Sequence, residues 1–236
     1  MLMRDATDSF LKKWFACSAG MSVLHELSKE LEKISCFLNQ TTALQLGFES
    51  HEAFNFLPFR SHWIITPSRF SYTHLQASFE HLPFAKHTID CIIMPFSNVN
   101  CPMNDAFIKE IDSILKPGGY LIFWGVNPYS CWGYWFYTQK KRHYFEQFNF
   151  FTAGALLRKM KRYAYNMSFL SYFYHLPPLN SLWLLENLKA AHGLGKLFSP
   201  LPAGFFCLMV QKKIIQYQID FQKNQACIAL LETGFF

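Results

Sequence analysis

Charged side chains are scarce in this chain, and the signatures of several common kinds of catalytic site are missing. Only 16% of the 236 residues are Asp, Glu, Lys or Arg, against 51% hydrophobic residues. No two cysteines have the Cys-x-x-Cys spacing, and no histidines have the His-x-His or His-x-x-x-His spacing, so no metal site is predicted. The Gly-x-Ser-x-Gly elbow of hydrolases and a phosphate-binding loop are also absent.

The chain has no segment typical of export or membrane insertion. Its N-terminus is charged, where a signal peptide would be basic and then apolar. The uncharged stretch between Lys116 and Lys140 is interrupted by glycines and Pro128, so no transmembrane helix is predicted there. The seven cysteines are odd in number and fit reduced thiols packed as small hydrophobic residues. We therefore expect a cytoplasmic protein.

What the chain has in excess is aromatic residues and positive charge. It contains 26 Phe, and its net charge is +6, with basic residues gathered at 140–142 and 158–162. An aromatic surplus permits an exposed apolar patch for a greasy substrate, a membrane surface or a partner. No zinc finger or RNP motif accompanies the charge, so the sequence favours a small-molecule substrate over nucleic acid. A peripheral membrane or protein contact through the region 129–162 remains open.

Apolar periodicity predicts helices that alternate with short strands, as in a doubly wound α/β sheet. The segment 129–137 (YSCWGYWFY) is expected to be a loop that caps the carboxyl end of this sheet. One domain is predicted over 1–213, with the helices of 1–40 packing on it and a tail of unclear structure over 214–236. The predicted helices are 7–16, 20–36, 50–57, 105–115, 150–163 and 181–191, and the predicted strands are 43–46, 63–65, 75–79, 89–94, 120–126, 165–174 and 204–211.

Three short motifs follow one another in the middle of the chain. They are Leu82-Pro83-Phe84, then Asp90 at the start of an apolar strand, then Leu115-Lys116-Pro117-Gly118-Gly119 before the next strand. This order resembles that of class I S-adenosylmethionine-dependent methyltransferases of the type 11 group, and Gly125–Ser130 adds a likeness to a proteobacterial subgroup with a degenerate glycine motif. The resemblance implies a Rossmann-like, seven-stranded, mostly parallel sheet whose last strand is antiparallel, and S-adenosylmethionine as cofactor.

The resemblance also implies where the cofactor binds, at the carboxyl ends of the strands. It assigns no catalytic residue, because displacement at a sulfonium carbon mainly requires that the acceptor be positioned. Phe96 either packs on the cofactor or belongs to the core, and Asn127-Pro128-Tyr129 is interpreted as a turn. The implied cofactor-binding residues are Gln45, Gly47, Glu49, Thr66, Ser78, Phe79, Pro95 and Phe96.

The chain departs from the family where that cofactor would bind. Only Gly47 remains of the three glycines in the first motif, since Glu49 and His51 replace the others. Thr66 and Ser78 stand where the family carries carboxylates for the ribose and the adenine. Lost polar contacts of this kind would weaken cofactor binding about 10²–10⁴-fold. Three hypotheses follow: a methyltransferase with a small apolar or aromatic acceptor, a non-catalytic binding protein of the same fold, and a nucleic-acid methyltransferase, which only the basic charge supports.

Overall fold

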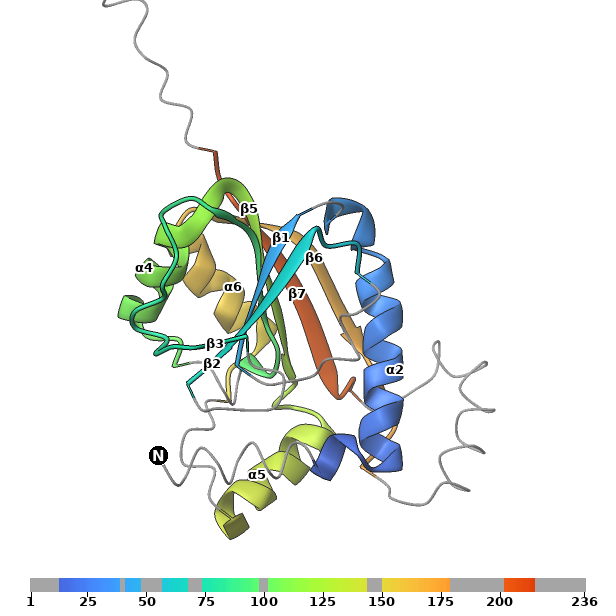
Figure 1. Cartoon of the computed structure of the whole chain (residues 1–236). Coiled ribbons are helices and arrows are strands. Elements are labelled where there is room, and N and C mark those ends of the chain that lie inside the picture. The colour runs from blue at the N-terminus through green and yellow to red at the C-terminus, as the bar shows by residue number, and fades with distance from the viewer. Residues whose placement is uncertain are drawn as a thin grey trace, which may run out of the picture.

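The computed structural model describes residues 13–38, 41–47, 57–67, 74–97, 102–143, 150–178 and 202–214. Its centre is a seven-stranded sheet in the order β3-β2-β1-β4-β5-β7-β6 (Figure 1). The strands are β1 (Thr42–Leu46), β2 (Ser61–Thr66), β3 (Leu75–Gln76), β4 (Ile89–Met94), β5 (Leu115–Val126), β6 (Tyr165–Phe173) and β7 (Phe205–Lys212). Most of the predicted helix 50–57, the predicted helix 181–191 and the chain beyond residue 214 lie outside the described residues.

The strand directions confirm the predicted fold class. Strand β1 pairs in parallel with β2 on one side and with β4 on the other, and β4 pairs in parallel with β5. Strand β7 is antiparallel to both of its neighbours, β5 and β6. The chain leaves β1 toward one end of the sheet and returns at β4 to build the other. The neighbouring carboxyl ends of β1 and β4 are therefore the switch point where doubly wound sheets bind ligands.

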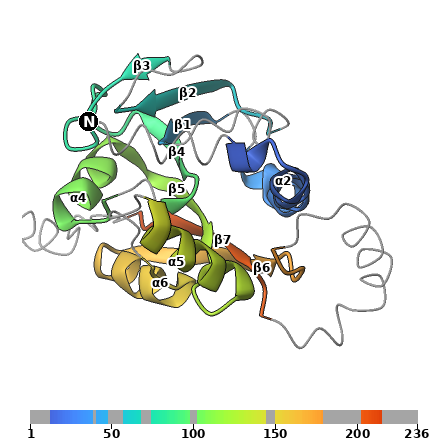
Figure 2. The same cartoon turned by 90° about the horizontal axis from the view of Figure 1, so that it is seen from below.

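Both faces of the sheet are covered, which explains why its central strands are almost wholly apolar. Along β4, Cys91 and Ile93 pack with α2 (Ser18–Glu32), while Ile92 and Met94 face the opposite layer. That layer contains α4 (Asp105–Ile114) and α6 (Ala153–Arg162). Figure 2 shows α2 on one side of the sheet and α4 with α6 on the other.

Side-chain caps fix the starts of two of these helices. Asn104 accepts a hydrogen bond from the Phe107 backbone at 2.8 Å and begins α4. Thr152 accepts one from the Ala155 backbone at 3.1 Å and begins α6. Short polar residues stabilise helix starts in this way because the first backbone N–H groups have no partner within the helix.

The loop predicted over 129–137 is wrong, because this segment enters helix α5 (Cys131–His143). The Ser130 hydroxyl accepts a hydrogen bond from the Gly133 backbone at 3.0 Å and so caps the helix. Trp132 and Phe136, four residues apart, are buried, whereas Tyr134 is exposed. The aromatic residues thus follow helical spacing, with an apolar face turned inward.

Several predicted boundaries also differ. The helix predicted over 20–36 ends at Glu32, and a short 3₁₀ helix, η1 (Ser35–Leu38), follows it. Strand β3 keeps only two of its five predicted residues. Strand β5 begins early because Leu115 pairs with Ile89 before the register shifts and Tyr120 pairs with Cys91. Within the described residues, no helix is both long and apolar enough to cross a membrane.

Candidate functional site

Gly47 lies directly after β1, at the switch point of the sheet. Its φ of +89° belongs to the left-handed region, which glycine enters without steric cost. Its N–H group donates a hydrogen bond to the Ile65 carbonyl at 2.9 Å, so the turn is tied to β2.

The neighbouring positions on β1 and β2 carry neutral side chains. Gln45 is fully buried in β1, in register with Ile64 of β2 and Ile93 of β4. Thr66 ends β2, is buried, and its carbonyl accepts a hydrogen bond from the Ala77 backbone at 3.3 Å. The structure therefore places amide and hydroxyl groups where the family pattern has carboxylates.

Ser78 and Phe79 follow β3 and have different surroundings. Ser78 is exposed, and its hydroxyl accepts a hydrogen bond from the Glu80 backbone at 3.4 Å. Phe79 is buried, with its ring centre 5.8 Å from that of Phe107 on α4. Only Ser78 of this pair has a side chain open to a ligand, while Phe79 fixes the segment to the core.

Pro95 and Phe96 form the turn after β4. Both are buried, and Phe96 has a φ of +47°, a backbone conformation that residues with a Cβ adopt at a cost. The Phe96 ring centre lies 4.5 Å from that of Trp124 and 5.2 Å from that of Phe15. The side chain thus packs against other aromatic rings of the core, and its contact with the cofactor stays a prediction.

Phe96 is part of a larger group that we call the aromatic cluster. The group joins the start of the described chain, the turn after β4, the end of β5, helix α5 and the start of β7. It closes the carboxyl ends of β4 and β5 on the α2 side of the sheet. Its members are Trp14, Phe15, Phe96, Trp124, Trp132, Phe136 and Phe205, all of them buried.

The aromatic segment 129–137 was predicted to lie at this end of the sheet, but part of the cluster was not predicted. Trp14 and Phe205 lie near opposite ends of the chain, and their ring centres are 6.2 Å apart. Periodicity within one segment carries no information about such a contact. The available signal was only that aromatic residues stand at the ends of several predicted elements.

The three motifs that carry the family resemblance lie mostly at the opposite edge of the sheet. Asp90, near the start of β4, accepts a hydrogen bond from the Thr42 backbone at 3.0 Å and forms an ion pair with Lys116 at 2.7 Å. Glu110 accepts a hydrogen bond from the Leu82 backbone at 2.8 Å. A Cβ added to Gly119 would lie 2.8 Å from the Asp90 carbonyl oxygen. These residues hold β1, β4 and β5 together at the amino ends of the strands. They lie away from the carboxyl ends, where the family binds its cofactor.

Asn127 confirms the interpretation of its segment as a turn. Its amide group donates a hydrogen bond to the Ala203 carbonyl at 2.9 Å, and its side-chain oxygen accepts one from the Tyr129 backbone at 3.2 Å. Both polar ends of the side chain therefore serve the junction between β5 and β7.

Two buried thiols lie within the sheet, and neither is a candidate nucleophile. Burial raises the pKa of Cys91 well above its usual range, and the charge of Asp90 adds to the shift. Burial likewise raises the pKa of Cys207 to about 12. Because the thiolate is the reactive form, both side chains stay inert near neutral pH. The described residues contain no group of three or more metal-ligating side chains.

A comparison with known families identifies the motif-bearing part of the chain. The family described as the methyltransferase domain matches residues 26–123, a span that contains Gly47, the turn after β4 and all three motifs. Residues 26–123 are therefore similar to a methyltransferase domain. The resemblance seen in the sequence is thereby confirmed, and S-adenosylmethionine is the cofactor of this domain family, as predicted.

One curated relative matches over a short stretch. The ubiquinone/menaquinone biosynthesis C-methyltransferase of Haemophilus ducreyi is 43% identical over 49 residues, which are 21% of this chain. These residues span about a fifth of that protein (19%), so the match concerns a segment of each chain.

Solved structures share the fold over most of the chain. An S-adenosylmethionine-dependent methyltransferase of Thermotoga maritima, described as a possible histamine N-methyltransferase, aligns with a TM-score of 0.64 at 19% identity, covering 89% of this chain and all (100%) of that one. A methyltransferase of Aquifex aeolicus aligns with a TM-score of 0.55 at 11% identity, covering 86% and 97%. At these identities the likeness establishes the fold.

The described residues fit the methyltransferase cofactor in part. The positive φ of Gly47 and the parallel β1–β4 junction place a left-handed glycine at the switch point, where this fold binds ligands. The described ends of β2 and β3 offer the hydroxyls of Thr66 and Ser78 as hydrogen-bonding groups. Hydroxyls bind ribose and adenine with less energy than charged acceptors do. Glu49 lies outside the described residues.

Proposed function

We propose that this protein is an S-adenosylmethionine-dependent methyltransferase whose acceptor is a small apolar or aromatic molecule. The observation that carries the proposal is the preserved turn at Gly47, at the switch point of a sheet whose family uses this position for the cofactor.

Different residues would serve the cofactor in different ways. The Gly47 turn allows close backbone approach, Ser78 presents its hydroxyl, and Phe79 and Phe96 hold their turns in place from the core. The bound cofactor supplies a methyl group on a positively charged sulfur, which is already activated for transfer. The full proposed set is Gln45, Gly47, Glu49, Thr66, Ser78, Phe79, Pro95 and Phe96.

The chain's own task is then to orient the acceptor and to exclude water. The aromatic cluster closes the carboxyl ends of β4 and β5 with carbon-rich side chains, an environment that suits an apolar acceptor. Tyr129, Tyr134 and Tyr137, in or next to helix α5, are 80%, 70% and 44% exposed. They would give a poorly soluble acceptor aromatic side chains to contact.

Thermal unfolding with S-adenosylhomocysteine tests cofactor binding directly. A ligand at about 100 times its Kd stabilises the native state by about 2.7 kcal/mol. We expect a rise in melting temperature that saturates with ligand concentration. The absence of any rise at millimolar ligand would reject the proposal and leave a non-catalytic protein of the same fold.

The Ser78→Asp variant tests the site itself. It restores the charged acceptor that the family carries at this exposed position, and we expect affinity for S-adenosylhomocysteine to increase about tenfold, or about 1.4 kcal/mol. Ser168→Asp is the matched control, because Ser168 is exposed on β6, the outer strand on the opposite side of the sheet from β3. Equal affinities of the two variants would show that the adenine does not contact residue 78.

A further inference from the structure

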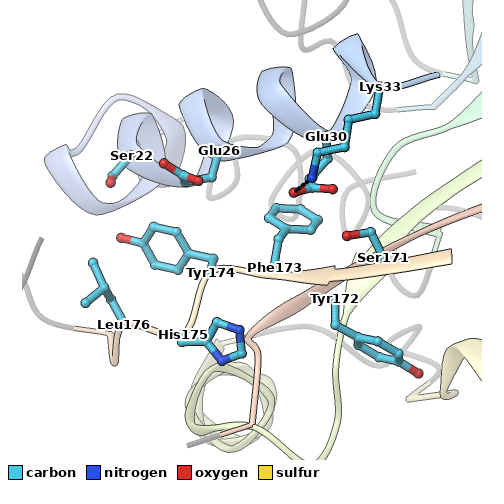
Figure 3. A pocket seen from close by; sticks show the side chains of 10 residues that line it. All are labelled: Ser22, Glu26, Glu30, Lys33, Ser171, Tyr172, Phe173, Tyr174, His175 and Leu176. Carbon is cyan, nitrogen blue, oxygen red and sulfur yellow. Dashed lines mark hydrogen bonds and ion pairs between the residues drawn. The ribbon is translucent and has the colours of Figure 1, made fainter. Parts of the chain in front are cut away.

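A pocket lies between helix α2 and the end of edge strand β6 (Figure 3). Its volume is about 270 Å³. Helix α2 contributes Ser22, Glu26 and Glu30, and the β6 end contributes Phe173 and Tyr174. Neither the family match nor the proposed methyl transfer assigns a role to this pocket.

Glu30 gives the pocket its chemical character. The residue is only 7% exposed, which is unusual for a carboxylate. Its Oε1 atom accepts a hydrogen bond from Lys33 Nζ at 2.6 Å. Its Oε2 atom is buried and has no hydrogen-bond partner among the described residues. A buried carboxylate oxygen of this kind is costly unless a donor reaches it.

The rest of the lining combines aromatic rings with neutral polar groups. Figure 3 shows the Glu30 carboxylate and the Phe173 ring pointing toward each other from α2 and β6. Farther along, Ser22 and Tyr174 place hydroxyls on the wall. Burial raises the pKa of Tyr174, so its hydroxyl keeps its proton and presents no negative charge. Negative charge is thus confined to the α2 wall.

We propose that this pocket binds a small organic ammonium ion with an apolar body. The ammonium N–H groups would donate to Glu30 Oε2, and the body would lie against the rings of Phe173 and Tyr174. Lys33 is compatible with this occupant, because its side chain is 53% exposed and engages only Oε1. A metal ion fits less well, since the described residues offer no group of three ligands.

Titration calorimetry on the full chain tests the proposal with 2-phenylethylammonium as the probe. The neutral 2-phenylethanol and the anionic phenylacetate keep the ring and change only the charge. We expect the ammonium probe to bind at least tenfold more tightly than either comparator. Equal affinity for the alcohol, or no heat with the amine at millimolar concentration, would overturn the proposal. S-adenosylhomocysteine is left out, so the result does not depend on cofactor binding.

Variants of α2 assign the binding to this pocket. Glu30→Gln removes the charge at constant shape and is expected to lower the affinity for the probe at least tenfold. Glu32→Gln makes the same change at an exposed position and should leave that affinity unchanged. Full affinity in Glu30→Gln would place the probe elsewhere and reject the site.

A second variant keeps the test decisive if Glu30→Gln does not fold. Lys33→Gln removes the ammonium group that is paired with the Glu30 carboxylate. The affinity for the probe should then rise several-fold, because the repulsion between two ammonium groups is removed. Weaker binding of the probe to Lys33→Gln would contradict a role for the Glu30 charge.

Discussion

At the scale of single residues, Asp90 shows that a family motif can serve the fold alone. Its carboxylate joins three strands, since it accepts the Thr42 N–H group of β1 and the Lys116 ammonium of β5 from its own place on β4. All of these contacts lie at the amino ends of the strands. The motif therefore persists for reasons of stability, whatever happens at the cofactor edge.

Asp90→Asn should reduce stability and leave ligand binding intact. We expect the free energy of unfolding to fall by about 1 kcal/mol, because the ion pair is lost and one backbone hydrogen bond loses its charged acceptor. Chemical denaturation at neutral pH measures the change, and the affinity for S-adenosylhomocysteine should stay within error of the wild type.

Asp105→Asn provides the comparison for this change. Its ion pair with Lys159 is longer, at 3.3 Å, and its side chain is 73% exposed, so a smaller loss is expected. A fall in the affinity of Asp90→Asn for S-adenosylhomocysteine would contradict the view that Asp90 acts only on stability, away from the carboxyl ends of the strands.

At the scale of elements, helix α6 ends on a residue that is poorly suited to its position. Ala164 has a φ of +61°, the left-handed conformation that usually ends a helix on glycine. Its N–H group donates to the Lys161 carbonyl at 3.2 Å, which closes the last turn. Here the backbone geometry is imposed by the following strand β6, whose first residue is Tyr165.

Ala164→Gly should stabilise the protein by about 0.5–1 kcal/mol, because glycine relieves the cost of positive φ. Ala155→Gly, within the same helix, should have the opposite sign and cost about 0.5–1 kcal/mol through lower helix propensity. Thermal unfolding of the two variants decides between these signs. Destabilisation by both would show that the end of α6 carries no such strain.

The same elements show what the sequence could predict. Strand β4 was predicted over its full length, because an apolar run of this size covered on both faces has few alternatives. Helix α5 was missed because Trp, Tyr and Phe are mediocre helix formers and Gly133 interrupts them. The decisive signals were the Ser130 cap and the burial of residues 132 and 136, and only the first is visible in the sequence.

The site was predicted less completely than the fold. The place of Gly47 after an apolar strand indicated a turn, and its positive φ is typical of a turn glycine, while its contact with the cofactor stays a prediction. The aromatic cluster and the Glu30 pocket both depend on contacts between segments far apart in the chain. Such contacts arise from the packing of α2 and α5 on the sheet, which local spacing does not encode.

At the scale of the whole molecule, buried thiol and phenol groups make the stability of the fold decrease at high pH. Burial raises the pKa of Cys91, Cys207 and Tyr165 above their usual values, with Asp112 adding to the shift of Tyr165. Raised values mean that these groups stay protonated in the folded state while they lose protons in the unfolded state. Their contribution to stability is therefore complete at neutral pH and decreases as the pH rises above 9.0, the usual value for the thiols.

We expect the free energy of unfolding to fall between pH 9 and pH 11, by up to about 1.4 kcal/mol per pH unit for each group. Denaturant titrations at a series of pH values measure the slope. Cys207→Ala removes one of these groups, so the free energy of unfolding should fall less steeply, by up to about 1.4 kcal/mol per pH unit. A slope identical to that of the wild type would show that Cys207 does not contribute.

The aromatic cluster also determines how the molecule interacts with light. Three of the six tryptophans (Trp14, Trp124 and Trp132) belong to it, and the Trp135 ring centre lies 5.8 Å from that of Trp132. Indole rings at such spacing exchange excitation energy and emit from a carbon-rich environment. A molecule that entered between the turn after β4 and helix α5 would therefore change the intrinsic fluorescence, so binding of the proposed acceptor could be followed without a dye.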